Sequence, residues 1–503
     1  MKIQRTKKAS LVLLCLIGAH LINAQQKPGV NLELMDKTVK PGDDFFRFVN
    51  GKWYDNTEIP SDRVRWGSFD ELRQNTDKDA LAILKAAAAN KKLDPKSDQA
   101  KAVNVFRTYM DTISRNKRGM TPINESLAKI NAVKSIEDLN KLIIEMQPQG
   151  GLGFYGIGVG PDAKNSNKNI VNIGLGSLGL PDRDYYVSED ADSKEKRQKY
   201  VFHVAKMLQF IGEDAEQAKV DAKMVLALET AMATPRLDRV ERRDRRKTYN
   251  LMTVADLQKL TPAVNWDALI KGVGIATIDS LNVSQPKYMT ALQTIFTATK
   301  IEEWKAYLRW SLVNKSADIL TTEIEKANWD FYSQTLQGAK KQRPREERAL
   351  AVVNATLGEA LGKLYVEQKF PAEAKEKASK MIKNIFLAFE NRINKLAWMT
   401  PETRKGAIEK LRKSNVKIGY PDKWKDYSKL AIKSSEEGGT YYDNMKNVAK
   451  WSFQENIDDL KKPVDKTRWG MAPQTVNAYY SATNNEIVFP AAITTSILQL
   501  QSG

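Results

Sequence analysis

Apolar residues recur at spacings of three and four over most of this chain, which is the period of an amphipathic α-helix. Within residues 77–148 one such stripe contains Ala102, Val105, Phe106, Tyr109 and Met110. The pattern returns over residues 194–235 and again over residues 289–398. There the clearest stripe consists of Ile382, Ile385, Phe386, Phe389, Ile393 and Leu396. The chain is therefore predicted to be mainly α-helical, with long amphipathic helices.

Two stretches have the alternation and turn residues of β-hairpins instead. The first pairs Phe154–Gly160 with Asn169–Gly176 across a polar connector. The second is Thr475–Ile493, in which two runs with apolar residues flank a polar turn that contains an Asn-Asn pair. The strand with Asn477 and Ala478 is expected to leave one edge open, so that an extended peptide can pair with its backbone.

Capping and breaking residues indicate where two N-terminal helices begin and end. Asp44 can cap a helix whose C-terminal end is expected near Gly51. Ser68 can cap the next helix, because Glu71 stands three residues further on, in the spacing of a capping box.

A later helix has an equally clear start. Thr400 supplies an N-cap and Pro401 suits the first helical position. Gly419 and Pro421 are predicted to close this helix.

Length and composition bound the class of protein. A chain of 503 residues is expected to form two or more domains, and 42% hydrophobic residues indicate a globular protein. The formal net charge of +18 can attract nucleic acid, anionic envelope lipid or acidic peptides. The densest basic run, Arg236–Asn250, is interleaved with acids and has no aromatic residues among its arginines. It predicts an ion-paired helix face, and no nucleic-acid partner is expected.

The N-terminus has the pattern of a secretory signal. A positive segment, Lys2–Lys8, precedes the short apolar segment Leu11–Ile22, and Ala24 offers a cleavage position. An uncleaved membrane anchor is the alternative. The mature protein is expected in the periplasm, at the cell envelope or secreted. Cys15 is the single cysteine and lies inside this segment, so the mature chain can form no disulfide.

The residue inventory excludes several kinds of catalytic site. A catalytic zinc takes three protein ligands, usually His, Cys or a carboxylate. The chain has two histidines, His20 in the signal segment and His203 on an apolar helix face, where a core or edge position is expected. A Ser-His-Asp set would depend on His203, and no G-x-S-x-G segment is present. The G-x-G-x-x-G of Gly174–Gly179 is followed by no helix, so a dinucleotide site is not predicted.

Several segments resemble one known family in their order along the chain. They are residues 41–76, GLPDRDYY at 179–186, WMTPETRKGAIEKL at 398–411, and NAYY at 477–480 with NEIVFPA at 485–491. Together they resemble the neprilysin/endothelin-converting-enzyme family of zinc metallopeptidases (gluzincins), in a bacterial exported form.

The resemblance implies a division of the chain into five parts. Residues 1–24 are the signal peptide, and residues 25–43 are a lead-in that packs with the catalytic domain. Residues 44–398 form a multi-helical cap domain with a small β-hairpin. Residues 399–493 form the N-terminal edge, a helix and a β-hairpin, of a thermolysin-like catalytic domain. Residues 494–503 depart from the family pattern, and the chain is expected to be truncated before the family's H-E-x-x-H motif.

The resemblance also implies substrate-binding residues. Asn477 and Ala478 match the pair that holds the peptide backbone. Arg65 and Asp70 match positions near the primed-side pocket, where the arginine can meet a substrate's C-terminal carboxylate. Phe69 matches a residue of the specificity pocket. Judged from their local sequence alone, Arg65 and Asp70 could merely pair with each other near a helix start.

Ile493 completes the substrate-binding residues that the resemblance implies. No catalytic residue and no metal ligand is assigned, because the family's zinc is held by H-E-x-x-H and a later glutamate. Zinc is expected in the full-length family and not on this chain.

The expected function is that of a neprilysin-like metalloendopeptidase of oligopeptides, represented by an N-terminal region that is inactive alone. A non-catalytic exported peptide-binding module is the alternative. The expected partners are peptide substrates, the envelope membrane surface and a missing catalytic half supplied in trans. Without that half, one face of the hairpin and of the helix from Thr400 to Asn415 is expected to be exposed.

Overall fold

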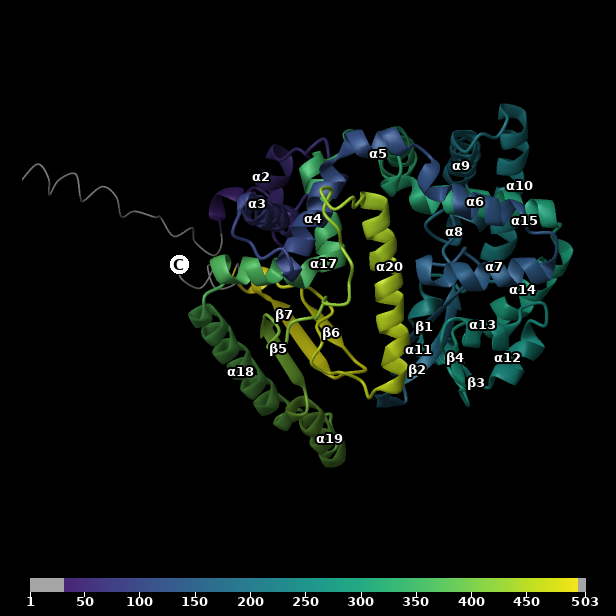
Figure 1. The fold of residues 1–503 in the computed structure, drawn as a ribbon. Coiled ribbons are helices and arrows are strands. Elements are labelled where there is room, and N and C mark those ends of the chain that lie inside the picture. Colours follow the sequence, from purple (N-terminus) through teal and green to yellow (C-terminus); the bar gives the residue numbers. More distant parts are fainter. Residues whose placement is uncertain (1–30, 496–503) are drawn as a thin grey trace, which may run out of the picture.

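A computed structural model describes residues 31–495 (Figure 1). The predicted signal peptide, with Cys15 and Ala24, lies outside the described residues, as do residues 496–503 of the predicted aberrant end. No helix among residues 31–495 is long and apolar enough to cross a bilayer.

Helices make up most of the described chain, as the periodicity predicts. The α-helices are α2 (Phe45–Asn56), α3 (Ser68–Ala89), α4 (Asp98–Met110), α5 (Thr112–Arg118), α6 (Asn124–Asn131), α7 (Ile136–Met146), α8 (Asp184–Val187), α9 (Ala191–Phe210), α10 (Ala215–Ala233), α11 (Arg245–Thr248), α12 (Val254–Leu260), α13 (Trp266–Gly272), α14 (Pro286–Ala298), α15 (Ile301–Ser316), α16 (Thr322–Trp329), α17 (Arg345–Lys369), α18 (Ala372–Asn394), α19 (Pro401–Arg412) and α20 (Tyr441–Asp458). Shorter turns are η1 (Leu32–Leu34), η2 (Thr121–Ile123), η3 (Gln147–Gln149), η4 (Glu241–Arg243), η5 (Ala317–Ile319), the π-helical η6 (Asp330–Thr335) and η7 (Asp459–Lys461).

The first two helices correct two predicted boundaries. The Asp44 carboxylate caps α2 by accepting the Arg47 N–H at 2.9 Å, which confirms the predicted start. The predicted end at Gly51 is wrong, because α2 runs on to Asn56. Gly51 instead allows close packing, since a Cβ there would lie 2.5 Å from Asp36 Cβ. The capping box at Ser68 is also wrong, because Ser68 is already helical and follows Gly67.

The first predicted hairpin is confirmed and forms part of a four-stranded sheet. Strands β1 (Tyr155–Asp162) and β2 (Asn165–Leu175) pair antiparallel, with Tyr155 opposite Leu175. Strands β4 (Leu281–Val283) and β3 (Leu251–Met252) complete the order β1-β2-β4-β3. No helix directly follows Gly174–Gly179, as predicted, because a loop comes after β2; the four-residue helix α8 begins only at Asp184.

The second predicted hairpin is confirmed with a shorter first strand. Strands β6 (Tyr479–Ser481) and β7 (Glu486–Pro490) pair antiparallel. Asn477 and Ala478 lie just before β6. A third strand, β5 (Asn415–Gly419), pairs parallel with β7, so the order is β5-β7-β6.

Strand β5 overturns the predicted end of the helix after Thr400. Thr400 does cap α19, accepting the Thr403 N–H at 3.2 Å. The helix ends at Arg412, however, and residues 415–419 are strand. The physical reason is non-local, because this short segment obtains its backbone partners from β7, about 70 residues further along the chain.

The buried apolar residues form two large clusters. One is built from residues 123–331 together with Ile457, and the other joins α3, α4 and α17 to residues 427–493. Helix α20 contributes to both, with Tyr441 in the second cluster and Ile457 in the first. The Asn456 side chain ties α20 to β1, accepting from the Val159 N–H at 2.8 Å and donating to its carbonyl at 2.7 Å.

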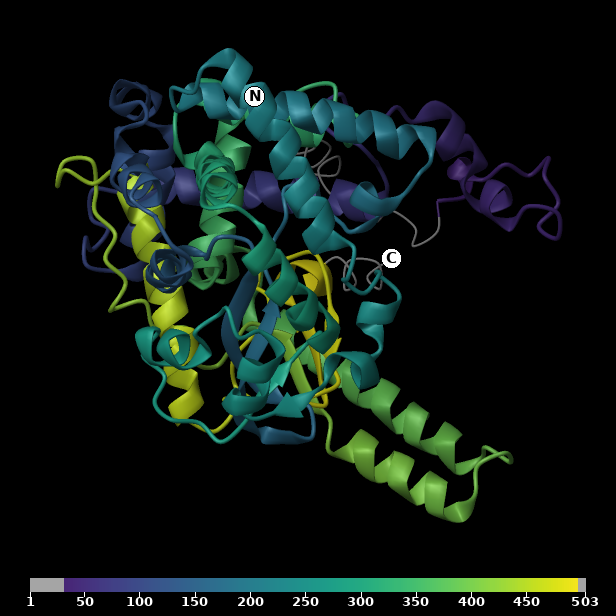
Figure 2. The same ribbon diagram turned by 90° about the vertical axis from the view of Figure 1, so that its right-hand side faces the viewer.

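Helices α18 and α19 form a hairpin that projects from the body (Figure 2). The apolar stripe predicted on α18 is only partly buried. Ile382 and Ile393 are buried, whereas Ile385 and Phe389 are about half exposed. Trp398, between the two helices, is 74% exposed. An apolar face of α18 is therefore open to solvent. In α19, for which the sequence predicts an exposed face, no residue is buried.

Candidate functional site

The candidate site begins at the entry to α3. The Arg65 guanidinium lies 3.7 Å from the Asp70 carboxylate, and Arg73, one turn along α3, lies 3.6 Å from the same carboxylate. Arg65 keeps 74% of its side chain exposed. Ion pairs this long and this open contribute little to stability, about 1 kcal/mol or less. Most of the Arg65 side chain thus stays accessible to a ligand.

These residues line a pocket of about 350 Å³. Residues 62–73 form one side, and residues 329–348, from the end of α16 to the start of α17, form the other. The Ser61 carbonyl accepts the backbone N–H groups of Lys340 and Lys341 at 3.1 and 2.9 Å. An ion pair of 3.0 Å between Arg63 and Glu347 adds a second link. These contacts hold two distant parts of the sequence together around the pocket.

Arginine dominates the charge of this pocket. Its lining includes Arg63, Arg65, Arg73, Arg343 and Arg348, with Asp62 and Asp70 as the acids. We refer to it as the arginine pocket. The sequence could have indicated that Arg73 belongs to this site, because it stands three residues after Asp70 on the same helix. No sequence pattern could have indicated Arg343 and Arg348, because only the tertiary fold brings them into the same pocket as Arg65.

A buried carboxylate behind the arginine pocket fixes one of these arginines. Glu325, on α16, pairs with Arg115 at 2.9 Å and with Arg345 at 3.4 Å, and also forms an ion pair with Arg348. The Tyr109 hydroxyl donates to the same carboxylate at 3.0 Å. Burial, together with the charge of Glu325, raises the pKa of Tyr109 to about 12. Arg348 is therefore held in place before any ligand arrives.

The second predicted group lies at the start of β6. Asn477 and Ala478 are both exposed. The Asn477 carboxamide oxygen accepts the Ala478 N–H at 2.8 Å. Strand β6 is the outer strand of its sheet, and no strand among residues 31–495 pairs with its far edge. An extended peptide can therefore reach this backbone.

The remaining predicted residues are placed differently. Phe69 is 54% exposed beside Asp70 but does not line the arginine pocket. Ile493 is 8% exposed and belongs to the second apolar cluster, which leaves little of it for a ligand. Asn477 and Ala478 do not line the arginine pocket either. The structure thus brings five of the predicted residues together as two groups, one at α3 and one at β6, and places Ile493 in the apolar core.

The donors in residues 31–495 do not fit a catalytic zinc. This part of the chain has no group of three or more His, Cys, Asp or Glu side chains that could hold a metal ion. Its single histidine, His203, is buried and stacks on Phe331 with ring centroids 4.6 Å apart. Burial lowers the pKa of His203 to about 3. The predicted core position of His203 is confirmed.

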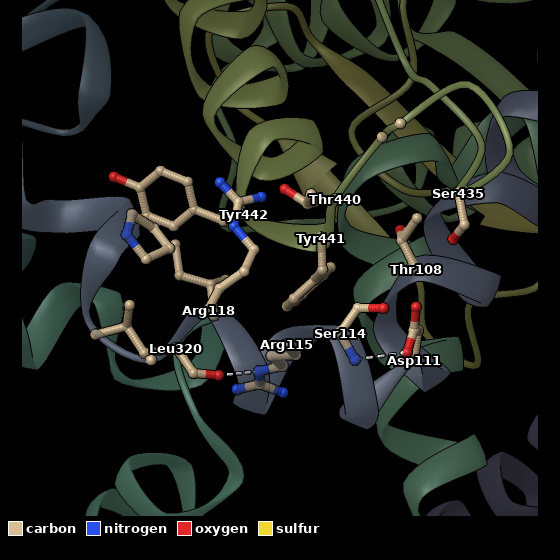
Figure 3. Close-up of a pocket in the computed structure, with 15 residues that line it drawn as sticks. Thr108, Asp111, Ser114, Arg115, Arg118, Leu320, Ser435, Thr440, Tyr441 and Tyr442 are labelled. Atoms are coloured by element: carbon tan, nitrogen blue, oxygen red, sulfur yellow. Dashed lines mark hydrogen bonds between the residues drawn. The ribbon is translucent and has the colours of Figure 1, made fainter.

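A second pocket, of about 240 Å³, lies between α5 and the start of α20 (Figure 3). Asp111 accepts the Ser114 N–H at 3.0 Å, and Arg118 pairs with Asp443 at 3.1 Å. Arg115 donates to the Leu320 carbonyl. Because these polar groups are already partnered within the protein, this pocket offers a ligand less than the arginine pocket does.

The basic run Arg236–Asn250 is ion-paired, as predicted, but is not one helix. It forms two short turns, η4 and α11. Arg242 pairs with Asp182, and Lys247 pairs with Glu241, both at 2.7 Å. Its charge is therefore neutralised in part within the protein.

Comparison with known proteins identifies the family. The model of Peptidase family M13 matches residues 41–421, so this chain belongs to the M13 peptidases. Endothelin-converting enzyme 1 of Bos taurus is 30% identical over 477 residues, which cover 92% of this chain and 62% of that relative. Neprilysin-3 of Drosophila melanogaster is 30% identical over 485 residues, covering 92% and 61%. The chain thus spans a little over three-fifths of the length of these relatives.

Solved structures agree on the fold. The crystal structure of the Mycobacterium tuberculosis zinc metalloprotease Zmp1 in complex with an inhibitor superposes with a TM-score of 0.86 at 33% identity, covering 93% of this chain and 70% of that one. PepO of Lactobacillus rhamnosis HN001 has the same fold, with a TM-score of 0.82 at 20% identity over 90% of this chain and 71% of that one. The family resemblance and the mainly helical fold are both confirmed.

Proposed function

We propose that this chain is the peptide-binding part of a neprilysin-like zinc metallopeptidase that acts on oligopeptides. The observation that carries the proposal is the open edge of β6, with Asn477 and Ala478 exposed where that edge begins. Membership in the M13 peptidases supports it. The names of the relatives, endothelin-converting enzyme and zinc metalloprotease, point to the same chemistry.

The proposed binding mode is addition of a strand. An extended peptide lies along β6 and pairs with its backbone, while Asn477 and Ala478 fix the register of the peptide. The exposed Arg65 meets the C-terminal carboxylate of the peptide, which a guanidinium can bind through two parallel hydrogen bonds. Asp70 and Arg73 orient Arg65 from behind.

Zinc and the general base belong to a part of the enzyme other than residues 31–495, whose donors do not fit the metal. We propose that the chain as given binds peptides without cleaving them. A catalytic half in trans would complete the enzyme. A purely peptide-binding module is the second candidate, and the same open edge favours it.

The proposed location is outside the cytoplasm, in the periplasm or at the envelope. The positive segment Lys2–Lys8 and the apolar segment that follows it support export. The basic charge of the chain would suit an anionic envelope surface as well.

Asn477→Ala tests the binding mode. Fluorescence anisotropy of a fluorescein-labelled oligopeptide should show a loss of affinity of about tenfold, because an amide that holds the peptide is removed. The midpoint of thermal unfolding should stay unchanged, since Asn477 is exposed. The matched control is Asn391→Ala, which removes an exposed amide from α18 and should bind like the unmodified chain. Equal affinity of the Asn477 variant and the control would contradict the mode.

A further inference from the structure

The arginine pocket holds more positive charge than its own ion pairs neutralise. Arg63 is well paired, with Asp62 and Glu347 each at 3.0 Å. Arg65 and Arg73, by contrast, share the single carboxylate of Asp70 at the longer distances of 3.7 and 3.6 Å.

On the other side of the pocket, formed by residues 329–348, arginines also outnumber the carboxylates that pair with them. Arg348 shares Glu325 with two further arginines, so one carboxylate serves three guanidinium groups. Arg343 is exposed and makes no ion pair with any residue in 31–495. Asp77 lies near enough to interact with Arg343 through space, and burial of the Asp77 carboxylate raises its pKa. Arg343 is therefore the least neutralised guanidinium of the pocket.

We propose that the arginine pocket binds an acidic side chain of the peptide, so that this protein prefers peptides with Glu or Asp next to the free carboxyl terminus. Such a peptide brings two carboxylates. Arg65 takes the terminal one, and Arg343, supported by Arg348, takes the side chain. This inference rests on the proposed peptide-binding function.

Size and chemistry both suit a carboxylate. A pocket of about 350 Å³ lies within the range of sites that hold small organic groups. Guanidinium groups match the planar carboxylate and are less strongly hydrated than ammonium groups, so they bind carboxylates specifically. The pocket draws its arginines from two separate segments of the fold, which lets them approach one side chain from two directions.

The test uses the full chain and two labelled oligopeptides with free carboxyl termini. The peptides are identical except that the residue before the last is Glu in one and Gln in the other. Anisotropy titration should give an affinity for the Glu peptide about tenfold higher at low salt, and this preference should shrink in high salt, because exposed charges are screened.

Arg343→Gln assigns the preference to the pocket. The affinity for the Glu peptide should fall to within about twofold of the affinity for the Gln peptide. Arg343→Lys should keep part of the preference, since the charge remains and the planar fork is lost. The matched control is Arg246→Gln, an arginine with 91% of its side chain exposed that does not line the pocket, and it should keep the full preference.

The outcomes separate the two claims. If both peptides bind unmodified protein equally well, or if Arg343→Gln keeps the preference, the acidic pocket is refuted while peptide binding stands. If neither peptide binds, the proposed function fails and the acidic preference fails with it.

Discussion

Buried ionisable groups in this protein differ in whether neighbouring residues compensate their charge. Glu325 is buried, yet three arginines and a tyrosine surround it, so its charge is compensated. His203 is buried among Trp310, Phe331 and Tyr332, and its Nε2 atom has no hydrogen-bond partner among the described residues. A protonated imidazole at this position would be an uncompensated buried charge.

This environment predicts acid sensitivity at His203. The folded-state pKa is lowered to about 3 by burial, with a smaller contribution from Lys206, whereas the ordinary value is 6.5. Between these values the unfolded chain binds a proton that the folded chain does not. Stability should therefore fall as the pH drops below 6.5, by up to about 1.4 kcal/mol per pH unit.

His203→Phe isolates this effect from the titration of other groups. The variant keeps an aromatic ring against Phe331 and removes the proton site. Its free energy of unfolding relative to the unmodified protein should rise by about 2 kcal/mol between about pH 7 and pH 5. Urea denaturation of both proteins across this range measures the difference, and a difference that does not change with pH would refute the account.

Helices and strands can be predicted from the sequence where their own residues contain the pattern. The stripe on α18 and the turn between β6 and β7 are visible in their own residues. Strand β5 was missed because it is only five residues long and its partner, β7, is distant in the sequence. Gly419, which we had assigned to a helix end, adopts a left-handed φ of 79° at the end of that strand.

A buried ion pair links β5 to β7. Lys417 Nζ lies 2.6 Å from Glu486, and the two side chains are 8% and 3% exposed. The same ammonium donates to the Arg468 carbonyl at 2.6 Å. The pair thus joins both strands to the segment that leads to β6, next to the proposed binding edge.

Lys417→Met should destabilise the protein by about 3–5 kcal/mol, because it leaves the Glu486 carboxylate buried without its partner. Adding Glu486→Leu should recover most of this loss, since two apolar side chains then replace the pair. Urea denaturation gives both values. Lys413→Met removes an exposed pair with Glu409 and should change stability by about 0.5 kcal/mol or less. An effect of Lys417→Met no larger than this control would contradict the role of the buried pair.

At the scale of the whole molecule, the site is assembled from segments that no local pattern connects. The sequence singles out Arg65 and Asp70 through the resemblance of residues 41–76 to one family, and the structure shows that the two side chains lie close together. The sequence does not single out Arg343 and Arg348, because the fold alone brings the start of α17 and the residues just before it to the entry of α3. The position of α20 could not be predicted either. This helix contributes to both apolar clusters, and each cluster consists of residues that are distant in the sequence.

The central claim is that this M13 chain binds peptides along β6 without a zinc site among residues 31–495. The most direct test incubates the full chain with a labelled oligopeptide and added zinc, measuring binding by anisotropy and cleavage by mass spectrometry. We predict binding that is independent of zinc, and an intact peptide. Zinc-dependent cleavage that a chelator stops, or no binding at all, would contradict the account.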